Sequence, residues 1–145
     1  MNYYFMNDAN ITREYQENNY HLVLICDDSG IFDTYKILRD KLWGGNNLLL
    51  SLIYTIPTNK INPLFERELR ILNKRFSHNL SVYKLRIDPE NFELIQEFIE
   101  AVINSNTCTK VQFSVSGKME FVDYVSGVLR YLNVNEDTID SQIIS

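Results

Sequence analysis

The stretch His21-Leu22-Val23-Leu24-Ile25-Cys26-Asp27-Asp28-Ser29-Gly30-Ile31 decides the fold. Its first six residues form a short, nearly continuous apolar run, which is typical of a strand buried on both faces of a parallel sheet. Gly30 closes a turn, and apolar residues at helical spacing continue from Ile31 to Leu42. The stretch therefore predicts a strand that runs through a tight turn into a helix.

The same pattern of strand and then helix recurs along the chain. A helix is predicted to begin at Asn62-Pro63, because asparagine caps helices and proline suits their first position. The predicted elements are a strand at 21–26, a helix at 31–42, a strand at 48–54, a helix at 62–76, a strand at 80–87, a helix at 92–103, a strand at 110–115, a turn at Ser116-Gly117, a helix at 122–132 and a strand within 138–144.

This alternation predicts an α/β fold: a doubly wound, mostly parallel five-stranded sheet with helices on both faces, joined by right-handed crossovers. We divide the chain into a lead-in segment, residues 1–20, which shows no clear period, and one domain, residues 21–145. Hydrophobic residues make up 45% of the sequence, which is enough for a packed core.

Composition narrows the partners and the compartment. The net charge is −5 with scattered lysines and arginines, so nucleic acid is not the expected ligand. No apolar run approaches the ~20 residues that a membrane span needs, and the N-terminus lacks the pattern of a signal peptide. Cys26 and Cys108 lie at strand-like apolar positions without metal or redox spacing, and we expect buried free thiols. These features favour a cytoplasmic protein.

Open α/β sheets bind ligands where their strands end, so the loops after Cys26, Tyr54, Ile87 and Val115 form the expected binding edge. A turn that leads into a helix offers free N–H groups to a phosphate. Asp27 and Asp28 oppose that chemistry. They are expected to cap the helix or remain solvated, with cation binding as the alternative.

The opening stretch resembles the H-L-V-L-I-A-G-G-[ST]-G-I-T-P segment of the ferredoxin–NADP reductase family. Four later segments resemble that family's L-I-Y-G-N-R-T, F-x-E-E-L, C-G-P-P-E-M-V-D and L-G-V-P-E-D-R-I, namely 51–54, 65–69, 116–123 and 132–139. The resemblance runs from about His21 to the C-terminus. It implies the fold of the family's C-terminal domain, which binds the nicotinamide nucleotide.

The resemblance also implies which residues would contact the cofactor. Asp27 and Asp28 stand where the family has two glycines, and the segment Ile56-Pro57-Thr58 lacks the family's nucleotide-contacting arginine. The implied cofactor is NAD or NADP, bound weakly or not at all, and FAD only through a separate domain. No catalytic residue and no metal ligand is assigned. The cofactor-binding positions that survive are Ser29, Gly30, Ile31, Thr58, Ser116 and Gly117.

Three functions fit this sequence. The first is the NAD(P)-binding module of a flavin-dependent oxidoreductase; as an enzyme it would use NAD(P)H and need a flavin domain outside this chain. The second is a non-catalytic member of the same fold that serves as a protein-binding scaffold, with Tyr3-Tyr4-Phe5 in the interface. The third binds a cation or another small ligand at Asp27-Asp28. The expected partners are a flavin domain, an electron-transfer protein or a second copy of the chain.

Overall fold

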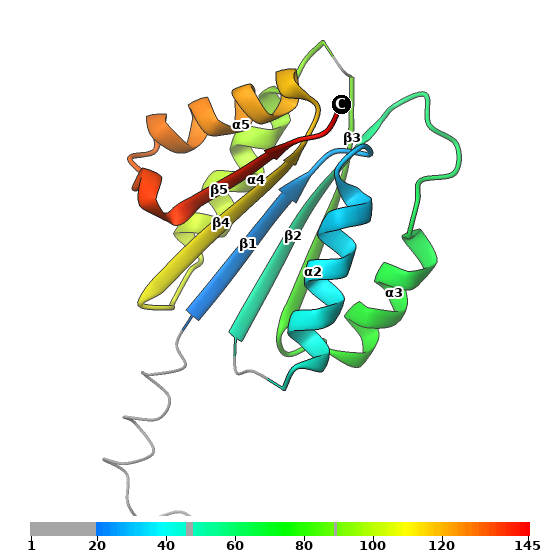
Figure 1. Cartoon of the computed structure of the whole chain (residues 1–145), viewed down its shortest axis with the longest axis vertical. Helices are drawn as coiled ribbons and strands as arrows, with labels where there is room; N and C mark the ends of the chain where they lie inside the picture. The colour runs from blue at the N-terminus through cyan, green and yellow to red at the C-terminus, as the bar shows by residue number, and fades with distance from the viewer. Residues whose placement is uncertain (1–19, 46–47, 89) are drawn as a thin grey trace, which may run out of the picture.

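The computed structural model describes residues 20–45, 48–88 and 90–145 (Figure 1). The predicted lead-in segment lies outside these residues except for Tyr20, which opens the first strand one residue earlier than predicted. The elements are β1 (Tyr20–Cys26), α2 (Ile31–Trp43), β2 (Leu48–Pro57), α3 (Glu66–Arg75), β3 (Leu80–Ile87), α4 (Glu93–Asn104), β4 (Lys110–Gly117), α5 (Met119–Tyr131), the 3-10 turn η1 (Glu136–Thr138) and β5 (Ile139–Ile143).

All five strands pair in parallel, in the order β3-β2-β1-β4-β5, so the predicted α/β class is confirmed. The chain builds outward from β1 to β3 and then returns to place β4 on the other side of β1. The strand order therefore switches between β1 and β4, where α/β sheets open a crevice at the ends of their strands. Cys26 ends β1 opposite Tyr54 and Ser116, so the turn after β1 lies at this switch point.

Two helical layers cover the sheet, with α2 and α3 on one face and α4 and α5 on the other (Figure 1). Successive side chains of β1 alternate between the layers, because a strand points them to opposite faces. Leu24 packs in the core under α2 and α3, while Val23 and Ile25 pack under α4 and α5. Each is fully buried, and burial of such a side chain stabilises the fold by about 1.5–3 kcal/mol.

Helix α3 begins at Glu66, so the predicted start at Asn62-Pro63 is wrong. Phe65 precedes the helix with a φ of 62°, a left-handed conformation that an α-helix cannot pass through. Tertiary contacts hold it there: the Phe65 ring stacks on Tyr35 with centroids 4.5 Å apart, and the Tyr54 hydroxyl donates to the Leu64 carbonyl at 3.1 Å. Leu64 and Phe65 fit the helical spacing of apolar residues in the sequence, but both lie before the helix.

Two further expectations need correction. Ser116 and Gly117 are the last residues of β4 and not a turn, because β4 keeps its pairing with β1 and β5 to its end. Cys108 lies in the loop before β4 and is partly exposed, whereas Cys26 is buried in β1 as expected; both thiols are free. Within the described ranges, no helix has the length and apolar character needed to cross a membrane.

Candidate functional site

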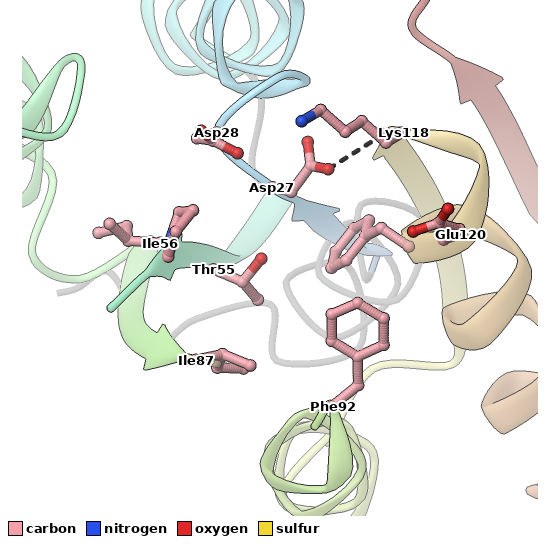
Figure 2. A pocket seen from close by; sticks show the side chains of 10 residues that line it. Asp27, Asp28, Thr55, Ile56, Ile87, Phe92, Lys118 and Glu120 are labelled. Carbon is pink, nitrogen blue, oxygen red and sulfur yellow. Dashed lines mark hydrogen bonds between the residues drawn. The ribbon is translucent and has the colours of Figure 1, made fainter. Parts of the chain in front are cut away.

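The turn after β1 is organised around the carboxylate of Asp27, which is only 8% exposed. Its Oδ1 accepts hydrogen bonds from the backbone N–H groups of Ser29 and Gly30, each at 2.9 Å. Its Oδ2 accepts from the backbone N–H of Lys118 at 3.0 Å (Figure 2). We call these three N–H groups the amide cradle; they bind one negatively charged group, and Asp27 supplies it.

Helix geometry explains why the cradle favours a negative charge. Helix α2 begins just after Gly30 and helix α5 just after Lys118, so the N-termini of both helices meet at Asp27. The first N–H groups of a helix have no partner within the helix, and the helix dipole adds positive potential there. Hydrogen bonds to an ionised acceptor are also stronger than those between neutral groups. The cradle thus offsets the cost of burying a carboxylate.

Two glycines allow the turn after β1 and the end of β4 to lie in close contact. A Cβ on Gly30 would lie 2.2 Å from the carbonyl oxygen of Ser116, and a Cβ on Gly117 would lie 2.6 Å from the Asp27 carboxylate. The backbone N–H of Asp27 donates to that same Ser116 carbonyl at 3.3 Å. Four of the residues predicted to bind the cofactor, Ser29, Gly30, Ser116 and Gly117, therefore converge on Asp27.

The other two predicted residues take no part in this arrangement. Ile31 is the first residue of α2, and its side chain is fully buried in the core under α2 and α3. Thr58 is exposed, and its backbone N–H donates to the Ile87 carbonyl at 3.3 Å, beyond the end of β2. Among the converging residues, Ser116 has a buried hydroxyl without a hydrogen-bond partner in the described part of the chain.

A pocket of about 150 Å³ opens beside Asp27, where β1, β2 and β3 end and where α4 and α5 begin (Figure 2). Small-molecule sites usually measure roughly 300–1,000 Å³, so this pocket is small. Two aromatic residues of its lining, Phe92 and Phe121, were not predicted as site residues from the sequence, although both follow the ends of strands. The lining residues are Asp27, Asp28, Thr55, Ile56, Pro57, Ile87, Phe92, Lys118, Glu120 and Phe121.

The charges around the pocket are mainly acidic: Asp27, Asp28 and Glu120 against Lys118. The predicted helix cap is not formed: the N-cap residue of α2 is Gly30, and no side chain caps this helix. Asp27 instead accepts the N–H groups of Ser29 and Gly30, just before the helix, and it is buried rather than solvated. Asp28 instead forms an ion pair with Lys60, with Nζ and Oδ2 3.8 Å apart. Among the residues that the structure describes, no three His, Cys, Asp or Glu side chains come together as a metal site.

Cys26 lies directly before Asp27, but it is not a reactive group. The thiol is completely buried, and this burial raises its pKa, with the neighbouring carboxylates acting in the same direction. A protonated thiol is a weak nucleophile. The site therefore offers no activated sulfur at the end of β1.

No family model and no curated protein sequence matches this chain. Solved structures do. A ferredoxin–NADP⁺ reductase from Plasmodium falciparum with 2′P-AMP matches with a TM-score of 0.62 and 15% identity, over 90% of this chain and 53% of that one. The CS-b5R domains of human Ncb5or in the NAD⁺ form match with a TM-score of 0.65 and 18% identity, over 88% of this chain and 38% of that one.

A flavohemoglobin from Malassezia yamatoensis with bound FAD and heme matches with a TM-score of 0.66 and 15% identity, over 88% of this chain and 32% of that one. The chain thus spans about half of the ferredoxin reductase and less of the other two. At these identities the matches show a shared fold. The expected fold, that of the NAD(P)-binding domain of ferredoxin reductases, is confirmed.

Proposed function

We propose that this chain is a nicotinamide-nucleotide-binding type of module whose phosphate-binding turn is closed by its own Asp27, so that NAD or NADP binds weakly or not at all. One observation carries the proposal: the Asp27 carboxylate already accepts all three N–H groups of the amide cradle. A phosphate bound at the same switch point would use such N–H groups at the start of α2. The residues present therefore do not fit a pyrophosphate.

The electrostatic repulsion between Asp27 and a bound phosphate would be large. A phosphate that entered with Asp27 in place would bring like charges to about 4 Å, and their repulsion is about 4 kcal/mol at the effective dielectric constant of ~20 near a protein surface. That energy corresponds to roughly a thousandfold loss of affinity. Moving Asp27 aside would instead cost its three hydrogen bonds. Either route weakens nucleotide binding.

Calorimetric titration with NADH and NADPH tests the proposal. We expect no measurable binding to the wild-type chain at millimolar nucleotide and at least a tenfold gain in affinity for Asp27→Gly. Asp28→Gly is the matched control, because it removes an equal charge from the same turn but leaves the cradle filled. Tight binding to the wild type, or equal gains in both variants, would contradict the closed turn.

A second function, that of a protein-binding module, is favoured by the surface around this turn. Ten large apolar side chains of the described residues are exposed, and six of them surround the edge where the strands end. Phe32 and Met119, 54% and 59% exposed, flank the amide cradle at the starts of α2 and α5. We call the six the apolar rim: Phe32, Ile61, Leu64, Leu94, Met119 and Ile143.

The partner we propose for the apolar rim is a flavin-bearing domain or an electron-transfer protein, in keeping with the flavin proteins that share the fold. Affinity capture with the wild-type chain as bait is compared with capture by a Phe32→Ser/Met119→Ser variant, and the captured material is examined for flavin absorbance. Flavin protein that binds the wild type and not the variant is the expected result. Equal capture by both baits, or capture free of flavin, argues against this partner, and light scattering shows whether the rim instead joins two copies.

A further inference from the structure

We propose a second binding pocket, which takes an uncharged, mainly apolar molecule of about two fused rings. It lies where the strands begin, at the opposite end of the sheet from the Asp27 turn; Figure 1 shows how the ribbons of β1 and β4 start at this end. The pocket measures about 340 Å³, more than twice the volume beside Asp27. It opens between the starts of β1 and β4, the ends of α4 and α5, and η1. Its lining residues are His21, Val23, Val102, Ile103, Asn106, Thr109, Val111, Phe113, Leu132, Asn133, Val134, Asn135 and Thr138.

The walls of this pocket combine buried residues of the hydrophobic core with apolar residues at its margin that are only partly buried. Val23, Val102 and Phe113 are buried members of the core under α4 and α5, and they line its inner wall. Four aliphatic side chains at its margin are only partly buried, namely Ile103, Val111, Leu132 and Val134. An apolar molecule in the pocket would remove these surfaces from water, which is the main driving force for such binding.

The floor of the pocket is a buried polar network around His21. Its Nε2 lies 2.8 Å from the Ser51 hydroxyl, and its Nδ1 lies 2.9 Å from Oδ1 of Asn106. The Asn106 amide is oriented by the backbone of Cys108: Oδ1 accepts from that N–H at 3.1 Å, and Nδ2 donates to that carbonyl at 3.0 Å. His21 must therefore carry its proton on Nδ1 and accept the Ser51 proton at Nε2.

This network makes the floor neutral and leaves it fully paired. Burial lowers the pKa of His21, so its ring is uncharged near neutral pH. No Asp, Glu, Lys or Arg lines the pocket among the described residues. A charged ligand would be desolvated there without a counter-ion, which is costly. Ser51 does not line the pocket, so the Ser51–His21–Asn106 arrangement orients the floor and offers no nucleophile to a ligand.

The volume sets the size of the ligand, and the rim sets its polar contacts. An apolar cavity of about 150 Å³ is enough to bind benzene, so about 340 Å³ admits two fused rings. Polar residues also line the pocket: Asn133 turns the chain with a φ of 63° after α5, Asn135 precedes η1, and Thr138 is the last residue of η1. One or two hydrogen-bonding groups on the ligand would meet these side chains.

Indole, an uncharged molecule of two fused rings with one N–H, is the probe for this pocket. We expect its titration into the ¹⁵N-labelled full chain to shift the amides of Val23, Ile103 and Val134 saturably and to leave the Asp27 turn unchanged. Indole-3-carboxylate should bind at least tenfold more weakly. Val111→Phe should abolish binding by filling the mouth, whereas Val82→Phe, on a partly buried valine of β3 outside the pocket, should not.

The proposal would be overturned by a lack of saturable shifts up to the solubility limit of indole, by equal binding of the carboxylate, or by unchanged binding to Val111→Phe. Shifts confined to the Asp27 turn would assign indole to the other pocket and would also overturn it. Should Val111→Phe fail to fold, intermolecular contacts between indole and wild-type methyl groups decide the question. The methyls of Val23, Val102 and Leu132 must show them, and their absence under saturating indole refutes the site.

Discussion

Replacing Asp27 with alanine should destabilise the chain far more than replacing the neighbouring Asp28. The Asp27 carboxylate is buried and accepts three backbone hydrogen bonds, from Ser29, Gly30 and Lys118. A hydrogen bond to a charged group contributes about 1.5–3 kcal/mol, and removing its acceptor leaves the buried donors unsatisfied. These contributions are not additive, and water entering the pocket recovers part of the loss. We therefore expect Asp27→Ala to lower the free energy of unfolding by about 3 kcal/mol.

Asp28 provides the internal standard for this measurement. Its only described ion pair is with Lys60, at 3.8 Å and partly exposed, and such pairs contribute about 0–1 kcal/mol. Urea and thermal unfolding of the wild type, Asp27→Ala and Asp28→Ala give the comparison. For a chain of this size, 3 kcal/mol corresponds to a fall in Tm of roughly 10 °C. Equal stability of the two variants, within about 0.5 kcal/mol, would refute the reasoning.

Gly117→Ala should lower the free energy of unfolding by about 1–3 kcal/mol, because its Cβ would lie 2.6 Å from the Asp27 carboxylate. Gly127→Ala in α5, with open space around it, should raise the free energy of unfolding by roughly 0.5–1 kcal/mol. Thermal unfolding measures both, and the reverse order of stability would contradict the prediction. Burial lowers the pKa of His21 below 6.5, so the unfolded chain binds more protons than the folded chain below that pH. Stability should therefore fall as the pH drops from about 6.5 through the folded pKa. His21→Gln should flatten this part of the pH–stability curve, and an unchanged slope would show that His21 is not its cause. A thiol reagent should label Cys108 in the native chain and Cys26 only after unfolding, which mass spectrometry of the labelled chain measures; native labelling of Cys26 would be the contrary result.

The fold was largely predictable from the sequence because its signals are local. The apolar run that ends at Cys26 and the helical spacing after Ile31 each lie within one element, and the predicted order of elements is the observed one. The start of α3 was not predictable, since it depends on the contact of Phe65 with Tyr35 on another helix. Local spacing carries no information about such a contact.

The candidate site was predictable only in part, for the same reason. The sequence predicted that Ser29, Gly30, Ser116 and Gly117 lie where strands end, and the structure brings them together there around Asp27. The sequence also predicted that the Asp27 carboxylate would oppose a phosphate, which stays a prediction. It did not reveal that the Asp27 carboxylate accepts three backbone N–H groups, because the third N–H comes from Lys118, 91 residues later in the chain. That contact exists only once β4 has paired with β1.

The amide cradle should accept a phosphate once Asp27 is removed, and a titration of two variants measures this most directly. Inorganic pyrophosphate is titrated into ¹⁵N-labelled Asp27→Gly and Asp28→Gly, and the backbone amide signals of Ser29, Gly30 and Lys118 are followed. If Asp27 closes the turn, all three signals should shift together and saturate in Asp27→Gly, and they should stay in place in Asp28→Gly. Unmoved signals in Asp27→Gly, or equal shifts in both variants, would contradict the claim that Asp27 closes this turn.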